Sequence, residues 1–531
     1  MIFKSPHPDV SIPEVPLAKF LFEGTDRFGD KPALIDGPSG RTITYSQLHA
    51  MVHSFARGLI ARGFGKGDVF AIFMPNLPEY AIAFHGVAAA GGTSTTINPL
   101  YTAEELAFQL DDAGAKYLLT IPQFLDRALE AARQTAVKEV FVLGGGDPNS
   151  TPGGAVGEGA TPFASLLDSG APSSVPDIKV HEDLVVLPYS SGTTGLCKGV
   201  MLTHHNLVSN ICQGEAVIAV DEDDTLIGIL PFFHIYGMTV IMNSALHRGA
   251  TVVTLPRFEL EAFLETMQNH RVTRAYLVPP IVLALAKHPV VDNYDLSALK
   301  FILSGAAPLG ADLAAECSER LDCLVVQGYG LTETSPVTHA TPDDPARNKP
   351  GSVGSPLPNT VCKVVDPASG DELGPNERGE VWIRGPQVMR GYLNNPDATS
   401  ATVDADGWLH SGDIGYADDD GYFYIVDRLK ELIKYKGFQV PPAELEAILL
   451  GHPAVSDAAV IPSPDEEAGE VPKAFVVLSG DASTDEILEF VAQKVSPQKK
   501  IRRIEVIDEI PKSPSGKILR RVLIEQERGN A

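Results

Sequence analysis

The stretch YSSGTTGLCKGV occupies residues 189–200 and has the composition of a loop that holds phosphate. Glycines let backbone N–H groups approach a phosphate, hydroxyls can bond its oxygens, and Lys198 supplies positive charge. The Walker pattern GxxxxGK[ST] fails at two positions, because Cys197 stands where the second glycine is required and Gly199 follows the lysine. The loop therefore predicts phosphate binding by a chain that is not a Walker ATPase, and the alternative is a Gly/Ser/Thr turn without a ligand.

Buried strands and helices are expected on both sides of this loop. The apolar run LVVLPY (184–189) precedes it and the helical pattern NLVSNICQ (206–213) follows it. Thr102 and Glu105 form a capping box that predicts a helix start. Further strands are expected at VFAIFM, KYLLTI, EVFVLGG, LIGILP, TVVTLP, AYLVP, FILSG and LVVQGYG. Apolar strands separated by helices indicate an α/β fold with largely parallel sheets.

The sequence pattern changes in the last third of the chain. After about residue 350 it becomes β-rich (CKVVD, EVWIRG, YFYIVD), and a compact α+β tail follows DRLKELIKYKG. We expect a large N-terminal domain over 1–428, made of layered βα subdomains plus a β-rich subdomain, and a small α+β C-terminal domain over 429–531. The Gly/Pro-rich segment that starts at Gly144 is expected to be a surface loop or a link between subdomains.

Composition limits the classes of partner. The 531 residues carry a formal net charge of −26, so nucleic acid and anionic membranes are disfavoured as partners. No apolar run is long enough for a membrane span, and the N-terminus lacks the pattern of a signal peptide. The five cysteines show no CxxC pair, which is typical of reduced thiols. These features predict a cytoplasmic enzyme.

Five motifs, in order, extend the argument beyond the loop. They are SSGTTGLCKG (190–199), QGYGLTET (327–334), GWLHSGD (407–413), DRLKELIKYKGFQV (427–440) and PSGKILRR (514–521). In sequence and spacing the chain closely resembles the adenylate-forming acyl-CoA synthetase superfamily. PFFHIYG, SGAAPLG and IKYKGFQVPPAELE resemble its 4-coumarate (cinnamate):CoA ligase-like branch. No carrier-protein module follows in the chain.

The resemblance implies an AMP-forming acid–thiol ligase that uses ATP, Mg²⁺ and coenzyme A. A carboxylate attacks the α-phosphate of ATP to give an acyl-adenylate and pyrophosphate, and the CoA thiol then displaces AMP. The first step joins two anions, so the site must supply positive charge and hold both reactants in line.

The resemblance also assigns the nucleotide site. The implied ATP- and AMP-binding residues are Ser190, Ser191, Gly192, Thr193, Thr194, Gly195, Lys198, Gly305, Ala306, Ala307, Gln327, Gly328, Tyr329, Gly330, Thr332, Asp413 and Arg428. Tyr329 would stack on adenine. Asp413 would accept from the ribose hydroxyls, assisted by Arg428. Thr194 and Glu333 would bind Mg²⁺ through oxygen.

Lysines near the C-terminus match the family residues of the two half-reactions. Lys517 would bridge the carboxylate and the α-phosphate. Lys434 and Gln439 would lie on the opposite face of a mobile C-terminal domain and serve thioester formation, with Lys430 as the hinge. Lys436 and Gly437 would bind CoA.

His234 would gate the acyl pocket and position the carboxylate; the alternative is a core histidine bonded to backbone. The implied pocket residues are Ile235, Tyr236, Thr239, Leu303, Gly305, Gly330, Pro336 and Val337. No acidic residue in HIYGMTV could pair with an ammonium, which disfavours amino acids.

Two departures from the family pattern bear on substrate and stability. Leu303 stands where plant enzymes of the branch carry a lysine that reaches the ring hydroxyl. Without that lysine, the expected preference for 4-coumarate over cinnamate or a fatty acid is weaker. Cys197 replaces a proline, which we interpret as simple tolerance and not as a redox sensor. The alternatives are a medium- or long-chain fatty acyl-CoA synthetase, a luciferase-like oxygenase and a non-catalytic nucleotide-binding protein.

Overall fold

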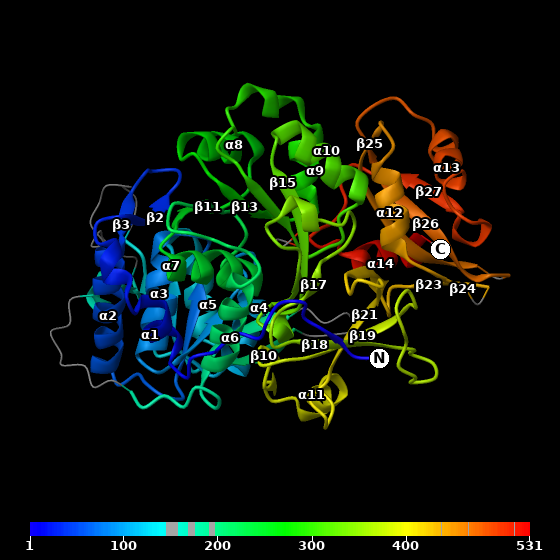
Figure 1. Ribbon diagram of the computed structural model, residues 1–531. Coiled ribbons are helices and arrows are strands. Elements are labelled where there is room, and N and C mark those ends of the chain that lie inside the picture. Colours follow the sequence, from blue (N-terminus) through cyan, green and yellow to red (C-terminus); the bar gives the residue numbers. More distant parts are fainter. Residues whose placement is uncertain are drawn as a thin grey trace.

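The computed structural model describes residues 1–144, 158–167, 176–190, 197–436, 438–465, 467–513 and 516–530. A large N-terminal part contains two broad sheets with helices around them, and a smaller C-terminal part has a sheet of its own (Figure 1). Most of the loop expected from Gly144 lies outside the described residues.

The first large sheet has the order β20-β10-β9-β5-β4-β6-β7-β8 within the described chain. Its strands are β4 (Val69–Phe73), β5 (Thr93–Thr96), β6 (Ala115–Thr120), β7 (Glu139–Val142), β8 (Thr161–Pro162), β9 (Leu184–Ser190), β10 (Lys198–Thr203) and β20 (Gly391–Tyr392). Its centre is parallel, and every residue of β4 is buried, as expected of a strand covered on both faces. The prediction of parallel α/β units is confirmed.

The phosphate-type loop joins two antiparallel strands. β9 ends at Ser190 and β10 begins at Lys198, with Lys198 opposite Ser190 in the ladder. The predicted helix is present as α6 (His204–Glu215), but β10 precedes it, a strand that the sequence pattern did not reveal. The helix expected after Thr102 is α4 (Ala103–Asp112), and its capping box with Glu105 is formed.

The second large sheet has the order β17-β16-β15-β14-β13-β11-β12-β2-β3 within the described residues. Its strands are β2 (Pro32–Asp36), β3 (Thr42–Thr44), β11 (Thr225–Gly228), β12 (Thr251–Thr254), β13 (Arg274–Leu277), β14 (Phe301–Ser304), β15 (Leu324–Gly330), β16 (Val337–Ala340) and β17 (Ser355–Pro356). β13, β14 and β15 are parallel neighbours, so the segments that follow β14 and β15 lie at one edge of the sheet.

A third, antiparallel sheet has the order β1-β18-β19-β21-β22. Its strands are β1 (Phe3–Lys4), β18 (Val361–Val365), β19 (Gly379–Arg384), β21 (Leu409–Ala417) and β22 (Phe423–Arg428). Asp413 on β21 stands directly opposite Arg428 on β22. This β-rich region was expected after residue 350.

The C-terminal part has its own sheet and core. It contains β23 (Ile433–Tyr435), β24 (Phe438–Val440), α12 (Pro442–Leu450), β25 (Val455–Asp465), β26 (Gly469–Leu478), α13 (Thr484–Ala492), β27 (Arg503–Val506) and α14 (Arg520–Asn530). Apolar side chains of its strands and helices form a separate hydrophobic cluster that includes Ile433, Val460 and Ile487. Lys430 is exposed in the turn between β22 and β23.

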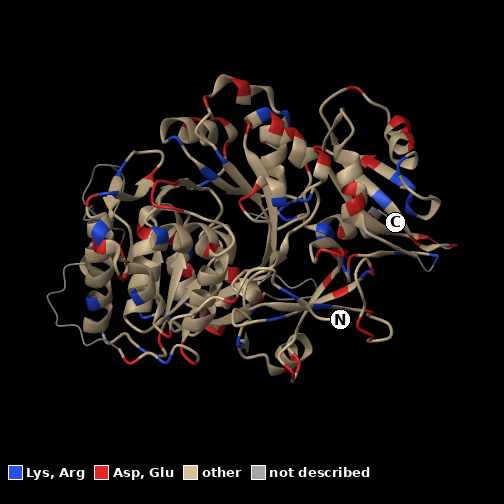
Figure 2. Cartoon of the chain, viewed as in Figure 1, with Lys and Arg blue, Asp and Glu red and all other residues tan. Residues whose placement is uncertain are grey.

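Charge and hydropathy add two observations. Acidic and basic residues are interspersed along both parts of the molecule (Figure 2). Within the described ranges, no helix is both long enough and apolar enough to cross a bilayer.

Candidate active site

Asp413 is held between two side chains from different sheets. The Tyr329 hydroxyl on β15 donates to its Oδ2 over 2.6 Å, and Nε of Arg428 lies 3.1 Å from its Oδ1. Burial raises the pKa of Asp413, while Arg428 and the Tyr329 hydroxyl oppose that rise. Burial and the Asp413 charge likewise raise the pKa of Tyr329. The predicted ribose acceptor, its basic partner and the adenine-stacking candidate are therefore in contact.

The loop after β14 is shaped by its glycine and by Gln327. The Gln327 amide accepts from the backbone N–H of Leu309 (3.0 Å) and donates to the carbonyl of Leu309 (3.1 Å), which fixes the loop beside β15. Ala306 has φ of 68°, a left-handed conformation that costs a non-glycine residue energy. A Cβ on Gly305 would lie 3.0 Å from the Tyr236 ring, so glycine permits this close packing.

QGYG also depends on close backbone packing. A Cβ on Gly330 would lie 2.0 Å from the carbonyl oxygen of Pro336, and one on Gly328 would lie 3.3 Å from the carbonyl oxygen of His339. Only glycine fits at position 330 without a backbone shift. β15 and β16 therefore approach closely next to Tyr329, which pairs with His339.

Glu333 lies at the centre of a cluster beside the phosphate-type loop. Its Oε1 accepts from Ser190 Oγ (3.1 Å) and from the Tyr392 hydroxyl (2.8 Å). Lys198 Nζ lies 4.8 Å from the centre of the Tyr392 ring. Thr332 and Glu333 are the first two residues of the short 3₁₀ turn Thr332–Thr334, so Glu333 lies in a helical turn and also contacts Ser190 at the start of the motif.

Tyr392 is a site residue that sequence analysis missed. Its position follows from pairing between β20 and β10, in which Tyr392 stands opposite Val200. Burial and the Glu333 charge raise its pKa. The dipeptide Gly391–Tyr392 carries no local signal for this contact. Ser191, Gly192, Thr193, Thr194 and Gly195 lie outside the described residues.

Lys517, from the C-terminal part, lies close enough to the charged residues described above to interact with their charges. It is solvent-accessible, yet loss of hydration and the nearby Arg428 charge lower its pKa, opposed by Asp413 and Glu333. Its backbone N–H donates to Ser513 Oγ over 3.1 Å. A Cβ on neighbouring Gly516 would lie 2.9 Å from a methyl group of Val278, so this loop packs against the N-terminal part.

His234 stands near Lys517 as a neutral imidazole. Burial, followed by the Lys517 charge, lowers its pKa to about 3. Its Nδ1 accepts from the backbone N–H of Tyr236 over 3.3 Å, so in the neutral ring the proton is on Nε2. The hydrogen bond to backbone expected for a core histidine is therefore present. The His234 ring can nevertheless still donate to a ligand through Nε2–H.

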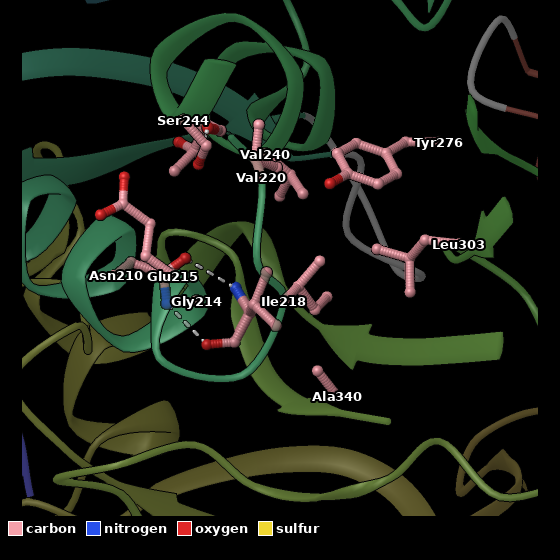
Figure 3. A pocket seen from close by; sticks show the side chains of 12 residues that line it. Asn210, Gly214, Glu215, Ile218, Val220, Val240, Ser244, Tyr276, Leu303 and Ala340 are labelled. Carbon is pink, nitrogen blue, oxygen red and sulfur yellow. Dashed lines mark hydrogen bonds between the residues drawn. The ribbon is translucent and has the colours of Figure 1, made fainter. Parts of the chain in front are cut away.

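A small cavity extends from the predicted acyl site (Figure 3). Thr239, Leu303 and Val337 line it, as predicted. Sequence analysis missed its other lining residues, which are Asn210, Gly214, Glu215, Ile218, Val220, Val240, Ser244, Tyr276 and Ala340. The predicted residues that do not line it are Ile235, Tyr236, Gly305, Gly330 and Pro336.

Two hydroxyls of the predicted acyl site, one of which lines the cavity, differ in their bonding. The Tyr236 hydroxyl is directed at the backbone carbonyl oxygens of Leu303 (3.1 Å) and Leu277 (3.4 Å). Thr239 Oγ1 is buried and has no hydrogen-bond partner among the described residues. The Tyr236 hydroxyl proton is therefore engaged, whereas Thr239 Oγ1 can still both donate to and accept from a ligand.

The candidate residues for the second half-reaction form a hairpin on the C-terminal part. Lys434 and Gln439 are paired across β23 and β24, and both are exposed. Lys436 forms an ion pair with Glu467 on the surface. Gly437 lies outside the described residues.

Known proteins resemble the chain over nearly its whole length. The model of the AMP-binding enzyme family matches residues 21–393, and that of the AMP-binding enzyme C-terminal domain matches residues 444–517. The 4-coumarate–CoA ligase 1 of Solanum tuberosum is 44% identical and the match covers 98% of this chain and 96% of that protein. The 4-coumarate–CoA ligase of Pinus taeda is also 44% identical, with 98% and 97% covered.

Solved structures agree with this relationship. The anthranilate CoA ligase AuaEII in complex with anthranoyl-AMP superposes with a TM-score of 0.89 at 26% identity, covering 98% of both chains. ATP-bound MatB from Rhodopseudomonas palustris superposes with a TM-score of 0.86 at 30% identity, covering 96% of this chain and 98% of that one. With the contacts described above, these matches show that the chain belongs to the AMP-binding enzyme family, whose members form adenylates.

Proposed function

We propose that the protein is an ATP- and Mg²⁺-dependent acid–CoA ligase that makes an acyl-adenylate and then an acyl-CoA thioester from 4-coumarate- or cinnamate-type acids. The observation that carries this proposal is that Lys517 lies close enough to both His234 and Asp413 for their charges to affect one another's pKa values. The three residues come from separate motifs of the family.

Adenylate formation requires two anions to approach each other. Three cationic side chains, Lys198, Arg428 and Lys517, supply positive charge at the site. This charge attracts both the α-phosphate and the incoming carboxylate. The Nε2–H of His234 would donate to the carboxylate and orient it. Because the His234 ring is neutral, it adds no charge that would compete with Lys517 for the substrate.

The oxygen donors around Glu333 fit Mg²⁺. A carboxylate beside the Ser190 hydroxyl gives the hard ligands that this ion prefers. Glu333, with Thr194 from the loop, would hold the ion, and Tyr392 would keep the carboxylate oriented. When bound, Mg²⁺ neutralises charge on the phosphates. The remaining ligands would be phosphate oxygens and water.

Thioester formation would use the exposed Lys434–Gln439 hairpin after rotation about Lys430, with Lys436 and Gly437 near CoA. In this proposal residues 1–428 form one domain and 429–531 the other. Three observations support this division. The antiparallel sheet ends with β22 at Arg428, the C-terminal part has its own hydrophobic cluster, and the turn between β22 and β23 is exposed at Lys430. In this proposal, Lys517 beside Asp413 and Glu333 represents the adenylation geometry.

The relatives support an aromatic propenoic acid as substrate. They are named 4-coumarate–CoA ligases, and the apolar wall around Leu303 suits a flat ring. Leu303 cannot bond a ring hydroxyl, whereas buried Thr239 Oγ1 can. A medium- or long-chain fatty acid is the second candidate, because the cavity also has aliphatic walls at Ile218 and Val220.

The test is release of pyrophosphate and formation of CoA thioester with cinnamate, 4-coumarate, caffeate, octanoate and palmitate. We expect kcat/KM to be highest for the cinnamates. Higher kcat/KM for octanoate or palmitate would assign the fatty acyl alternative. Pyrophosphate release without thioester, or light emission, would contradict the ligase. Thr239→Val should lower the 4-coumarate to cinnamate ratio of kcat/KM by about 3- to 10-fold if Thr239 bonds the ring hydroxyl.

A further inference from the structure

Two histidines and one carboxylate meet on the N-terminal part, and none of the three belongs to the candidate active site. His181 Nε2 lies 2.7 Å from Glu14 Oε2, and His205 Nδ1 lies 3.7 Å from Glu14 Oε1. The two imidazole rings face each other with centroids 4.0 Å apart. All three donor atoms lie within 4.8 Å of one another, and no other group of three or more His, Cys, Asp or Glu side chains in the described ranges does so.

Backbone and side-chain hydrogen bonds explain why these three residues meet. The backbone N–H of His205, in the first turn of α6, donates to the carbonyl of Val180 over 2.9 Å, which brings His181 alongside. The backbone N–H of Leu17 donates to His204 Nδ1 over 3.1 Å, which anchors the segment carrying Glu14. The cluster thus joins segments that are 167 residues apart in sequence.

One of these donors has bonding capacity left. His205 Nδ1 is buried and has no hydrogen-bond partner among the described residues. Glu14 and His181 side chains are each 59% exposed, so an ion and water can reach the site.

We propose that Glu14, His181 and His205 form a binding site for a divalent transition-metal ion, with Zn²⁺ as the ion of best fit. Two imidazole nitrogens and one carboxylate, with water in the fourth position, are a donor set that Zn²⁺ accepts. Ligand atoms around tetrahedral Zn²⁺ lie about 3.3 Å apart. The observed separations of 2.7 and 3.7 Å, which end on different oxygens of Glu14, are close to that value. Mg²⁺ prefers oxygen ligands and is a poor match.

The bound ion would fasten the N-terminal segment to the turn before β9. That strand ends at Ser190, beside Glu333, so the ion stabilises the framework of the nucleotide site without touching the substrate. The site is therefore structural, and it does not rest on the proposed ligase activity.

The test is a Zn²⁺ titration of the full, metal-stripped chain against a chromophoric zinc chelator, with Mg²⁺ in excess. We expect one Zn²⁺ per chain and a rise in melting temperature. His181→Gln and Glu14→Gln should each weaken Zn²⁺ binding by about tenfold or more and abolish the rise. Because both side chains are largely exposed, these variants should keep the fold.

The matched control is His53→Gln. His53 is exposed and forms a second close histidine pair with the half-buried His49, with Nε2 atoms 2.9 Å apart, one turn apart on α2 (Tyr45–Ala61). Zn²⁺ affinity of His53→Gln should equal that of the unmodified protein. Loss of binding in His53→Gln, or unchanged binding in His181→Gln and Glu14→Gln, would overturn the proposal. Co²⁺ loading with a thiolate charge-transfer band would assign the metal to cysteine instead and also overturn it.

Discussion

Tyr329 and Asp413 share a 2.6 Å hydrogen bond that joins the second large sheet to the antiparallel sheet. With Arg428 on the other carboxylate oxygen, Asp413 is fixed at the position proposed for the ribose. Hydrogen bonds to a charged group contribute about 1.5–3 kcal/mol, so Asp413→Ala should raise the KM for ATP about 10- to 150-fold. Pyrophosphate release at varied ATP measures this, and an unchanged KM would refute the ribose assignment.

Tyr392→Phe tests the site residue found only from the structure. The change keeps the ring against Lys198 and removes the 2.8 Å hydrogen bond to Glu333. A loss of about 0.5–1.5 kcal/mol should raise the Mg²⁺ concentration needed for half-maximal activity about 2- to 12-fold. Tyr422→Phe is the control, since its hydroxyl bonds the carbonyl of Arg347 instead. Equal Mg²⁺ dependence in both variants would contradict the role of Tyr392.

Lys517 and Lys434 should affect different half-reactions. Lys517→Ala removes the positive charge beside His234, so adenylate formation should fall about 100- to 1000-fold. Thioester formation from supplied acyl-AMP should be nearly unchanged. Lys434→Ala should show the reverse, because Lys434 is exposed on the β23–β24 hairpin. Single-turnover assays of each step distinguish them, and equal losses in both steps for both variants would reject the two-face assignment.

Local sequence signals predicted much of the framework. Runs such as Val69–Phe73 are apolar throughout because both faces of a parallel strand are covered, and that pattern is visible without a structure. The Thr102 capping box is equally local. Contacts between distant segments left no such signal. Tyr392 reaches Glu333 only because β20 pairs with β10. The strand that carries the cavity residue Tyr276 was predicted from its apolar residues, but that pattern does not indicate that Tyr276 lines a cavity.

The strand β10 shows a further limit. Lys198–Thr203 is short and mixed, so its strand character depends on pairing with β9 on one side and β20 on the other. Its first residue was recognised from the motif, while its secondary structure was not. The motif therefore predicted chemistry more accurately than local conformation, because pairing partners act over long sequence distances.

Cys197 should be the thiol that reacts in the native protein. Cys317, Cys323 and Cys362 are buried, and burial raises the pKa of partly exposed Cys212 to about 12. Cys197 is partly exposed and touches the Tyr101 hydroxyl at 3.5 Å. We expect Cys197→Pro to keep turnover near that of the unmodified enzyme and to lose sensitivity to a thiol reagent. Cys212→Ser is the control and should stay sensitive. Unchanged inactivation of Cys197→Pro would exclude Cys197 as the reactive group.

Asp427 should make stability depend on pH at the junction between the two parts. It is buried at the end of β22 and accepts from the backbone N–H of Ala443 on α12 over 2.8 Å. Burial raises its pKa to about 6 from the ordinary value of 3.8, although Arg520 opposes the rise. The folded protein therefore binds this proton more tightly than the unfolded chain. This contribution to stability is complete below about pH 4 and is lost as pH rises through about 6.

Asp427→Asn isolates that contribution. Between pH 5 and 7 the unmodified protein should lose about 1.4 kcal/mol of unfolding free energy relative to the variant. Most of this loss falls between pH 5 and 6, where Asp427 is largely protonated in the folded protein and ionised in the unfolded chain, and one pH unit in that condition corresponds to about 1.4 kcal/mol. Urea unfolding at pH 5, 6 and 7 measures the difference. Asp419→Asn alters an exposed aspartate and should follow the unmodified protein. If the stability curves of Asp427→Asn and the unmodified protein run parallel from pH 5 to 7, the Asp427 carboxyl does not titrate in this range, and its burial is compensated by Arg520 and the two backbone N–H groups that it accepts from.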